Sequence, residues 1–384
     1  MRCKQLFDTI DTLTLKYIDI WQDICNLESP TNHKAGVDAV GQYFAVRAKE
    51  KGWTVETLPQ SVSGDCVCIT MNPESKAAPV ALSGHMDTVH AVGSYGSPAV
   101  RIENGDIIGP GVVDCKGGLV AAFLAMDALE QCGFSRRPIL LLLQSDEENS
   151  SKTSQKETVR FMAQKAKNAV AFLNAEGGSR GKLTVARKGI IRYRLDVQGR
   201  AAHSSKCQEG ASAIAEAAYK IIELERWKEE GGITCNCGVI QGGTVANTVP
   251  EHCSVTVDIR YRTAEEYRQV SERVAAIAAT SHVAGTSCTV SVVSERVAME
   301  KTEKNLALFD SIQRIFAENG LGELCAVERP GGSDAADMTA AGIPTVDSIG
   351  VCGSNIHTLN ERAPLTSLAE SAKRMAAIVY CLEN

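Results

Sequence analysis

The sequence has no apolar run long enough to span a bilayer and no strong excess of charge of either sign. Its apolar runs stop well short of the roughly 20 residues that a membrane-spanning helix needs. The 40 Lys and Arg residues stand against 46 Asp and Glu residues, which gives a net charge of −6 with both signs mixed along the chain. This balance argues against nucleic acid or an anionic membrane as a partner.

The sequence also lacks an export signal and a clustered set of cysteines. Residues 1–21 alternate charged and apolar side chains, without the continuous apolar core of a signal peptide. The 14 cysteines are scattered, mostly within apolar segments. We therefore expect reduced thiols and a cytoplasmic protein. The Cys235-x-Cys237 pair is interpreted as structural, because no further Cys or His lies at the spacing of a metal-binding finger.

The chain is long enough for two or three domains. Up to residue 189, buried-strand patterns alternate with helical patterns. From residue 190 the strands alternate apolar and polar residues, in the β-α-β-β-α-β order of a ferredoxin-like unit. We predict an α/β fold, with a mixed sheet flanked by helices over 1–189 and 300–384 and an inserted ferredoxin-like α+β domain over 190–299.

Histidine and acidic side chains follow the strands of the first domain. The apolar run Pro79–Gly84 is followed directly by His85, and Asp87 lies two residues further on. Further candidates recur at intervals of 29, about 33 and 28 residues, which is the length of one strand and one helix. Because ligands bind beyond the carboxyl ends of the strands in an open α/β sheet, we expect these side chains to meet. They are Asp114 in a Gly-rich turn, Glu147 and Glu148 after the strand 138–144, and Glu176 after the strand 169–173.

Each of these motifs is ambiguous by itself. The acidic run Asp146-Glu-Glu148 fits a solvated turn, and His357 in its polar loop fits an exposed histidine. The Gly-rich turn around Asp114 could cradle phosphate, although it lacks the Walker spacing. Taken together, two histidines and three carboxylates suit two zinc ions if one carboxylate bridges them. Glu147 is then left over and free to act as a base.

The combined motifs resemble those of the dinuclear zinc aminoacylase/carboxypeptidase family. This family includes acetylornithine deacetylase, succinyl-diaminopimelate desuccinylase, aminoacylase and bacterial glutamate carboxypeptidase, and the resemblance covers essentially the whole chain. Glu28-Ser-Pro and the loop Gly242-Gly-Thr-x-x-Asn247-x-x-Pro250 are most similar to the glutamate carboxypeptidase branch. The other motifs are Ser83-Gly-His-Met-Asp-Thr-Val89, Gly109-x-Gly-x-x-Asp-x-Lys-Gly-Gly118, Asp146-Glu-Glu148, Ala175-Glu176 and His357.

The resemblance implies a zinc-exopeptidase-like fold, a lid and dimerisation role for the inserted domain, and a centre of two zinc ions. One ion would be held by His85, Asp114 and Glu176, and the other by Asp114, Glu148 and His357. Cobalt and manganese remain alternatives to zinc.

The resemblance also implies the roles of the groups around the ions. Asp87 would orient His85, and Glu147 would serve as general base and acid. The peptide bond between Asp114 and Cys115 is expected to be cis.

Substrate-binding and dimer roles follow from the resemblance as well. His203 would cross to the partner's active site, and Arg260 would bind a substrate carboxylate. Asn247 and the loop containing Gly332 and Ser333 match substrate-binding segments. From the residues alone, His203 fits either a core histidine or an exposed tip, and its small neighbours favour the tip.

The favoured function is a two-zinc hydrolase that cleaves an amide or peptide bond beside a free carboxylate, as a glutamate-carboxypeptidase-like enzyme or a dipeptidase. The alternative with the same chemistry is an N-acyl-amino-acid deacylase. A non-catalytic, metal-stabilised binding protein is the alternative of another class, and the spare acid Glu147 argues against it. A nucleophilic role for Cys115 is disfavoured, because no histidine is placed in the sequence to activate it. The substrate side chain stays open.

Overall fold

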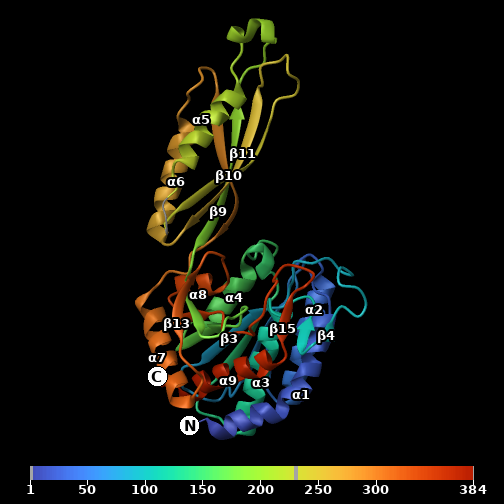
Figure 1. Cartoon of the computed structure of the whole chain (residues 1–384). Helices are drawn as coiled ribbons and strands as arrows, with labels where there is room; N and C mark the ends of the chain where they lie inside the picture. Colours follow the sequence, from blue (N-terminus) through green and yellow to red (C-terminus); the bar gives the residue numbers. More distant parts are fainter. Residues whose placement is uncertain (1–2, 229–231, 384) are drawn as a thin grey trace. The chain divides into compact units, whose positions relative to one another are not determined.

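The computed structural model describes residues 3–228 and 232–383, and the chain divides into two compact units (Figure 1). The first unit comprises Met1–Val185, Lys301–Glu328 and Ser333–Asn384. The second comprises Ala186–Glu300 and Arg329–Gly332. The domain predicted over 190–299 lies within the second unit. Each unit has its own buried apolar core.

The first unit is built on a large mixed sheet, which confirms the predicted fold class. The central strands β6, β3, β7 and β14 run parallel to one another, so their carboxyl ends lie at one edge. The outer strands β1 and β2 pair antiparallel. In sheet order the strands are β1 (Thr54–Leu58), β2 (Cys66–Met71), β6 (Ile139–Gln144), β3 (Val80–His85), β7 (Ala171–Asn174), β14 (Thr345–Asp347), β8 (Lys182–Arg187) and β13 (Cys325–Arg329).

Helices cover both faces of this sheet. Strand residues on one face, such as Leu82 and Leu141, belong to the core under α1 (Lys4–Asn26), α2 (Lys34–Glu50), α3 (Lys116–Gln131), α7 (Glu303–Asn319) and α9 (Thr366–Cys381). Residues of the opposite face, such as Ala81 and Leu140, pack against α4 (Glu157–Ala166) and α8 (Ala335–Ala340). This alternation is the one expected for strands buried on both faces.

Helix α3 is the central helix of the first unit. All but its last two residues are buried, as its Ala- and Leu-rich sequence predicts. Its first turn lies against the chain that follows β7. A Cβ added at Gly118 would lie 1.9 Å from the carbonyl oxygen of Ala175, so only glycine fits.

A small sheet brings two distant segments of the first unit together. Its order is β15 (Arg362–Pro364), β5 (Asp106–Ile108) and β4 (Arg101–Glu103). The pairing of β15 with β5 places the loop before β15 against the Gly-rich turn after β5.

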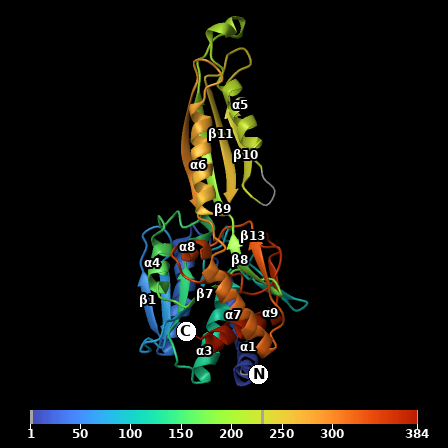
Figure 2. The same cartoon turned by 90° about the vertical axis from the view of Figure 1, so that its left-hand side faces the viewer.

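The second unit has the β-α-β-β-α-β order predicted from the sequence. Its antiparallel sheet has the order β10 (Thr234–Gly242), β11 (His252–Tyr261), β9 (Gly189–Gln198) and β12 (Ser287–Arg296). Helices α5 (Ala213–Glu225) and α6 (Ala264–Ala279) lie side by side on one face (Figures 1 and 2). Strands β9 and β11 alternate buried and less buried residues, because only that face is covered.

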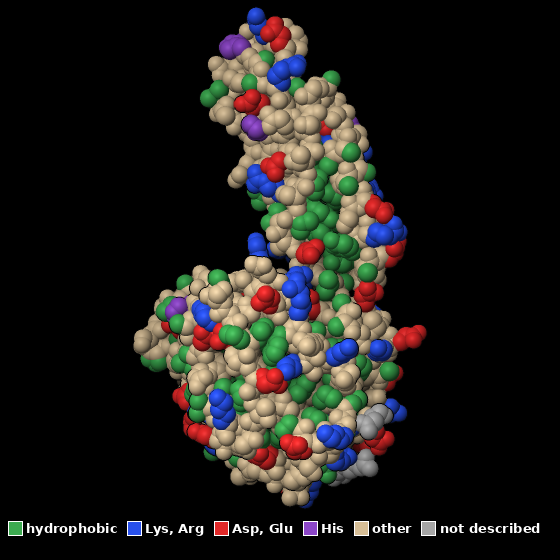
Figure 3. Space-filling model, turned by 180° about the vertical axis from the view of Figure 1, so that it is seen from behind, with side chains coloured by type: hydrophobic (Ala, Val, Ile, Leu, Met, Phe, Trp, Pro, Cys, Tyr) green, Lys and Arg blue, Asp and Glu red, His purple; other side chains and the backbone are tan. Residues whose placement is uncertain are grey.

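The surface agrees with the charge balance of the sequence. Basic and acidic side chains are interspersed on the face shown in Figure 3, without a large area of one sign. Within residues 3–228 and 232–383, none of the helices combines the length and the apolar character that crossing a bilayer requires.

A buried ion pair joins the two helices of the second unit. Lys220 and Glu216 lie on α5 with Nζ 3.0 Å from Oε1, and both side chains are almost fully buried. The Lys220 ammonium donates hydrogen bonds to backbone carbonyl oxygens at the end of α6, those of Ile277, Ala278 and Thr280. The Glu216 carboxylate accepts from the N–H groups of the next loop, those of His282 and Val283. The pair therefore links α5 to the C-terminal end of α6 and to the loop that follows it.

We predict that Lys220→Met lowers the free energy of unfolding by about 3–5 kcal/mol, because it leaves the buried Glu216 without its cation. Denaturant unfolding measures this loss. The control is Arg268→Met on α6, which removes only solvent-exposed ion pairs with Glu265 and Glu272 and should change little. Equal unfolding midpoints for the two variants would contradict the structural role of the pair.

Candidate metal centre

The structure brings all five predicted metal ligands together in the first unit. His85 is the last residue of β3. Glu148 lies in a short turn (Glu147–Asn149) that follows β6, and Glu176 lies two residues beyond β7. Asp114 precedes α3, and His357 lies in the loop before β15. The three parallel strands therefore deliver their ligands to one edge of the sheet, as expected from the spacing.

Asp114 lies between the two histidines. The Nε2 atom of His85 is 2.9 Å from Asp114 Oδ1, and the Nε2 atom of His357 is 3.0 Å from Asp114 Oδ2. A second carboxylate accompanies each imidazole, with Glu176 Oε1 3.6 Å from His85 Nε2 and Glu148 Oε2 3.3 Å from His357 Nε2. Each oxygen of Asp114 thus faces a separate group of one imidazole and one further carboxylate.

Burial governs the electrostatics of this cluster. Burial raises the pKa of Glu148 to about 7. The hydrogen bond from His357 acts in the opposite direction but is the smaller effect. Burial and then the charge of Asp114 raise the pKa of Glu176 well above its ordinary value. Asp114 behaves in the opposite way, because the hydrogen bonds from His357 and His85 outweigh burial and lower its pKa. Such a concentration of buried acids is costly unless cations balance it.

The donor set fits divalent metal ions. Imidazole nitrogens and carboxylate oxygens are donors that zinc takes, and a carboxylate with both oxygens directed at separate donor groups suits a bridging position. Two overlapping groups have donor atoms within 4.8 Å of one another, namely His85 with Asp114 and Glu148, and His85 with Cys115 and Glu176.

Asp87 connects three segments around the cluster. Its Oδ1 accepts the N–H of Glu147 and its Oδ2 the N–H of Glu148, both at 3.1 Å. The Thr31 hydroxyl donates to Oδ2 at 2.7 Å. The Nδ1 atom of His85 lies 2.9 Å from the Asp87 carbonyl oxygen and 3.4 Å from the carboxylate. An Nδ1–H donated to that carbonyl leaves Nε2, which faces Asp114, as the metal-binding nitrogen.

Glu147 lies beside the cluster, on the same short turn as Glu148. Its side chain is buried, and its charge contributes to the raised pKa of both Glu148 and Glu176. The short turn (Glu147–Asn149) carries both the predicted ligand Glu148 and the spare acid Glu147. The position of Glu147 is therefore compatible with a group that acts on substrate without holding an ion.

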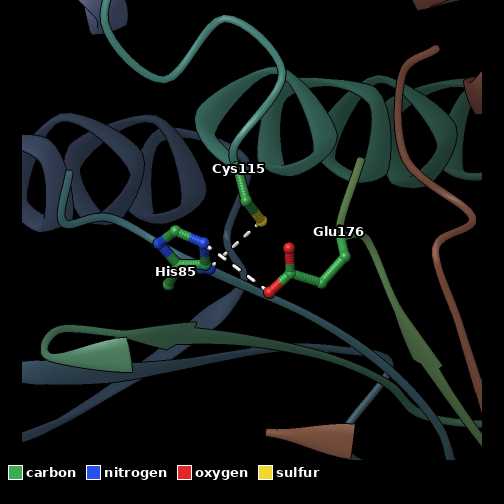
Figure 4. Close-up of side chains that lie close together, drawn as sticks. All are labelled: His85, Cys115 and Glu176. Carbon is green, nitrogen blue, oxygen red and sulfur yellow. Dashed lines mark hydrogen bonds and ion pairs between the residues drawn. The ribbon is translucent and has the colours of Figure 1, made fainter. Parts of the chain in front are cut away.

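Cys115 is enclosed in the interior next to the cluster (Figure 4). Its sulfur accepts the N–H of His85 at 3.3 Å and donates to the Ala175 carbonyl oxygen at 3.5 Å. Burial raises the pKa of the thiol well above its ordinary value, so the reactive thiolate is disfavoured. The peptide bond between Asp114 and Cys115 is cis, which confirms that expectation.

Sequence reasoning assigned no role to three polar residues that lie around the centre. Thr31 binds Asp87, as described above. Glu361 is buried, and its Oε1 accepts the N–H groups of Val113 and Asp114. The buried Lys116 donates to the Leu27 carbonyl oxygen at 2.9 Å. The sequence held weak signals for each: Glu361 follows His357 by four residues, Lys116 is the lysine of the Gly-rich motif, and Thr31 follows Glu28-Ser-Pro directly.

The predicted residues of the second unit form local contacts of their own. His203 is exposed and caps a short helix (Ser204–Glu209), with Nδ1 2.8 Å from the Ser205 hydroxyl. The Asn247 carbonyl oxygen accepts the Ser204 N–H at 2.9 Å, so His203 and Asn247 belong to one tip. Arg260 on β11 pairs with Asp258 at 2.6 Å.

The predicted loop of Gly332 and Ser333 falls at the boundary between the units. Gly332 belongs to the second unit, where a Cβ would lie 2.3 Å from the Arg296 side chain. Ser333 belongs to the first unit and is fully buried, and its hydroxyl donates to Asp347. Its hydroxyl is therefore engaged inside the protein.

The fold and the ligand cluster describe a metal-dependent hydrolase. A model of peptidase family M20/M25/M40 matches residues 81–380, so the chain belongs to this family. Carboxypeptidase G2 of Pseudomonas sp. (strain RS-16) is 26% identical over 362 residues, which cover 92% of this chain and 85% of that protein.

Solved structures share the fold. Aminopeptidase PepT of Bacillus cereus superposes with a TM-score of 0.78 at 22% identity, covering 95% of this chain and 98% of that one. The YXEP protein of Bacillus subtilis, a dinuclear metal-binding peptidase of the M20 family, superposes with a TM-score of 0.72 at 15% identity, covering 96% and 98%. These likenesses confirm the mixed α/β fold class.

Proposed function

We propose that this chain is a two-zinc hydrolase that cleaves the amide or peptide bond beside the free carboxylate of a small peptide, in the manner of a carboxypeptidase. The observation that carries the proposal is the position of Asp114, with one carboxylate oxygen directed at each of two imidazoles. The similarity to carboxypeptidase G2 over most of the chain supports a substrate with a terminal carboxylate.

In this proposal His85, Asp114 and Glu176 would hold one ion, and Asp114, Glu148 and His357 would hold the other. Two bound ions would supply Lewis-acid chemistry there, lowering the pKa of the attacking water and polarising the scissile carbonyl. The Asp87 backbone carbonyl keeps the proton of His85 on Nδ1, so that Nε2 is free to bind. The Asp87 carboxylate holds the turn of Glu147 and Glu148 by their N–H groups.

Glu147 moves the proton. It accepts a proton from the attacking water and returns it to the nitrogen of the leaving amine, as a general base and then a general acid. His203 donates a hydrogen bond to the oxyanion that forms at the scissile carbonyl, and Arg260 binds the substrate carboxylate. Asn247 and the backbone around Gly332 contribute contacts to the bound substrate, whereas the buried Ser333 hydroxyl holds that segment through Asp347.

We predict that removing metal with a strong chelator abolishes hydrolysis and that zinc restores it, with about two ions bound per chain. Cobalt and manganese are tested beside zinc. The substrate panel pairs dipeptides that differ in their C-terminal residue with N-acyl amino acids and with the corresponding C-terminal amides. Loss of activity toward the amides supports recognition of a free carboxylate. Full activity in metal-free protein would overturn the proposal, and activity toward N-acyl amino acids alone would make the enzyme a deacylase.

We predict that substitutions of the adjacent acids Glu147 and Glu148 affect different properties, turnover in one case and metal binding in the other. Glu147→Gln should keep both ions and lose activity by about 10²–10⁴-fold, because the amide cannot accept the proton of the water. Glu148→Gln should instead weaken metal binding, because it removes a ligand. Metal analysis beside turnover measures both effects. If Glu147→Gln lost metal and Glu148→Gln kept it, the two roles would have to be exchanged.

We further propose that two copies pair through the second unit. Strand β10 is an edge strand, and its residues Val239 and Ile240 are about half exposed. Ile214 and Ile222 are exposed on the neighbouring helix α5, eight residues apart and so on one side of the helix. Hydrophobic side chains also gather over the second unit in Figure 3. Pairing of β10 and α5 with a second copy would cover an open sheet edge together with apolar surface.

Such a pair would let His203 act in the partner's site, and mixing variants tests this. His203→Ala and Glu147→Gln homodimers should each be nearly inactive. A mixed dimer contains one site with an intact Glu147 and an intact partner His203, so activity should partly return. Mass analysis of the heterodimer and its metal content serve as controls. No recovery in confirmed heterodimers would show that His203 acts within its own chain or has no catalytic role.

A further inference from the structure

Glu361 accepts two backbone hydrogen bonds from the Gly-rich turn with a single carboxylate oxygen. Oε1 accepts the N–H of Val113 at 2.7 Å and the N–H of Asp114 at 2.9 Å. The residue is 2% exposed, so these bonds are shielded from water. The carboxylate thus holds the backbone of the residue whose side chain lies between the two imidazoles.

The same residue belongs to the loop that carries His357. This loop is closed at its base, where Ser354 and Arg362 exchange backbone hydrogen bonds of 2.9 and 3.1 Å. Glu361 lies just inside the base, and its own carbonyl oxygen accepts the N–H of Gly109 at 3.2 Å. The backbone of Glu361 therefore fixes the loop of His357, while its side chain fixes the turn of Asp114.

The rest of the loop is also fastened to the first unit. The Tyr95 hydroxyl donates to the carbonyl oxygen of Thr358, next to His357, at 2.7 Å. Strand β15 continues directly from Glu361 and pairs with β5, which leads into the Gly-rich turn. Glu361 lies where these two segments meet, more than 240 residues apart in the sequence.

The surroundings favour a positioning role over a chemical one. The oxygen that makes both contacts is directed at backbone N–H groups and not at the donor atoms of the ligands. Burial lowers the pKa of Lys116, and the charge of Glu361 acts against that shift. A buried carboxylate costs stability, and two charge-assisted bonds to N–H groups offset part of that cost.

We propose that Glu361 is a positioning residue that sets the two metal positions relative to each other, by holding the Asp114 turn against the His357 loop. The inference rests on the proposed two-metal function. Its consequence is that Glu361 controls binding of the ion on the His357 side although it touches neither ion. Partners of metal ligands commonly change metal affinity on the order of 10–100-fold when they are lost.

The test compares three variants of the full-length protein, with manganese(II) as the probe. Glu361→Ala removes both hydrogen bonds, whereas Glu361→Gln keeps an oxygen that accepts them. The control is Asp127→Ala, which removes a buried carboxylate from α3 of the same unit. Asp127 binds the Tyr17 hydroxyl at 2.7 Å and lies eleven residues, about 16 Å along the helix, beyond Lys116. Manganese titration gives the two affinities, and electron paramagnetic resonance reports the magnetic coupling of two ions that share a carboxylate.

We expect Glu361→Ala to keep one ion, to bind the second roughly 10–100-fold more weakly and to lose the coupled signal. Glu361→Gln should recover most of the lost affinity and the coupling. Asp127→Ala should lose thermal stability while keeping both ions and their coupling.

The outcomes separate this inference from the proposed function. Wild-type protein that binds fewer than two ions, or two ions without coupling, would overturn the two-metal function itself. With a coupled pair in the wild type, unchanged second-ion affinity in Glu361→Ala would overturn the positioning role. Loss in Glu361→Gln as large as in Glu361→Ala would also overturn it, since the charge and not the held geometry would then be responsible. If Glu361→Ala did not fold, Glu361→Gln would still test the role, because a loss of second-ion affinity of about 10-fold or more in that variant would overturn it.

Discussion

The first unit depends on keeping several acidic groups together in its interior. Asp114, Glu148 and Glu176 are drawn to the edge of a buried sheet, where two imidazoles contact them. Like charges at such distances repel, and burial adds to the cost of the ionised forms. The arrangement is therefore unfavourable for stability by itself, and the surrounding structure must hold it in place.

Two acidic residues, Asp87 and Glu361, hold the segments that carry these ligands through hydrogen bonds. Asp87 joins His85 to the turn of Glu147 and Glu148, through one carbonyl and one carboxylate. Glu361 joins the turn of Asp114 to the loop of His357. Backbone N–H groups are the donors in most of these bonds, so each carboxylate fixes the course of the chain as well as one side chain. The ligands are thus positioned by hydrogen bonds to the backbone of the segments that carry them.

The second unit is held together by a one-sided sheet and a buried ion pair. Its sheet has one covered face, and the buried pair of Lys220 and Glu216 closes the ends of its two helices. It leaves β10 as an open edge beside apolar residues of α5. An edge strand presents unpaired backbone N–H and C=O groups, and here it lies beside exposed apolar side chains.

Much of this could be predicted from the sequence, because its patterns are local. Uninterrupted apolar runs such as Ile139–Leu143 identify buried strands, and a spacing of about 30 residues between ligands identifies strand-plus-helix units. Parallel strands have their carboxyl ends on one side, so His85, Glu148 and Glu176 could be brought together without coordinates. The switch to alternating strands after residue 189 likewise indicated a second unit with one open face.

Only the tertiary structure decided how the ligands are held. Glu361 and Thr31 carry no motif of their own, and their partners Asp114 and Asp87 lie far away in the sequence. The burial of Ser333 against Asp347 was equally invisible, since a serine in a Gly-rich loop is as compatible with an exposed contact as with an internal one. The physical reason is that residue type and spacing determine which side chains a strand or helix presents. Which backbone groups a buried carboxylate meets depends on the pairing of distant segments, such as β15 with β5, that local patterns do not encode.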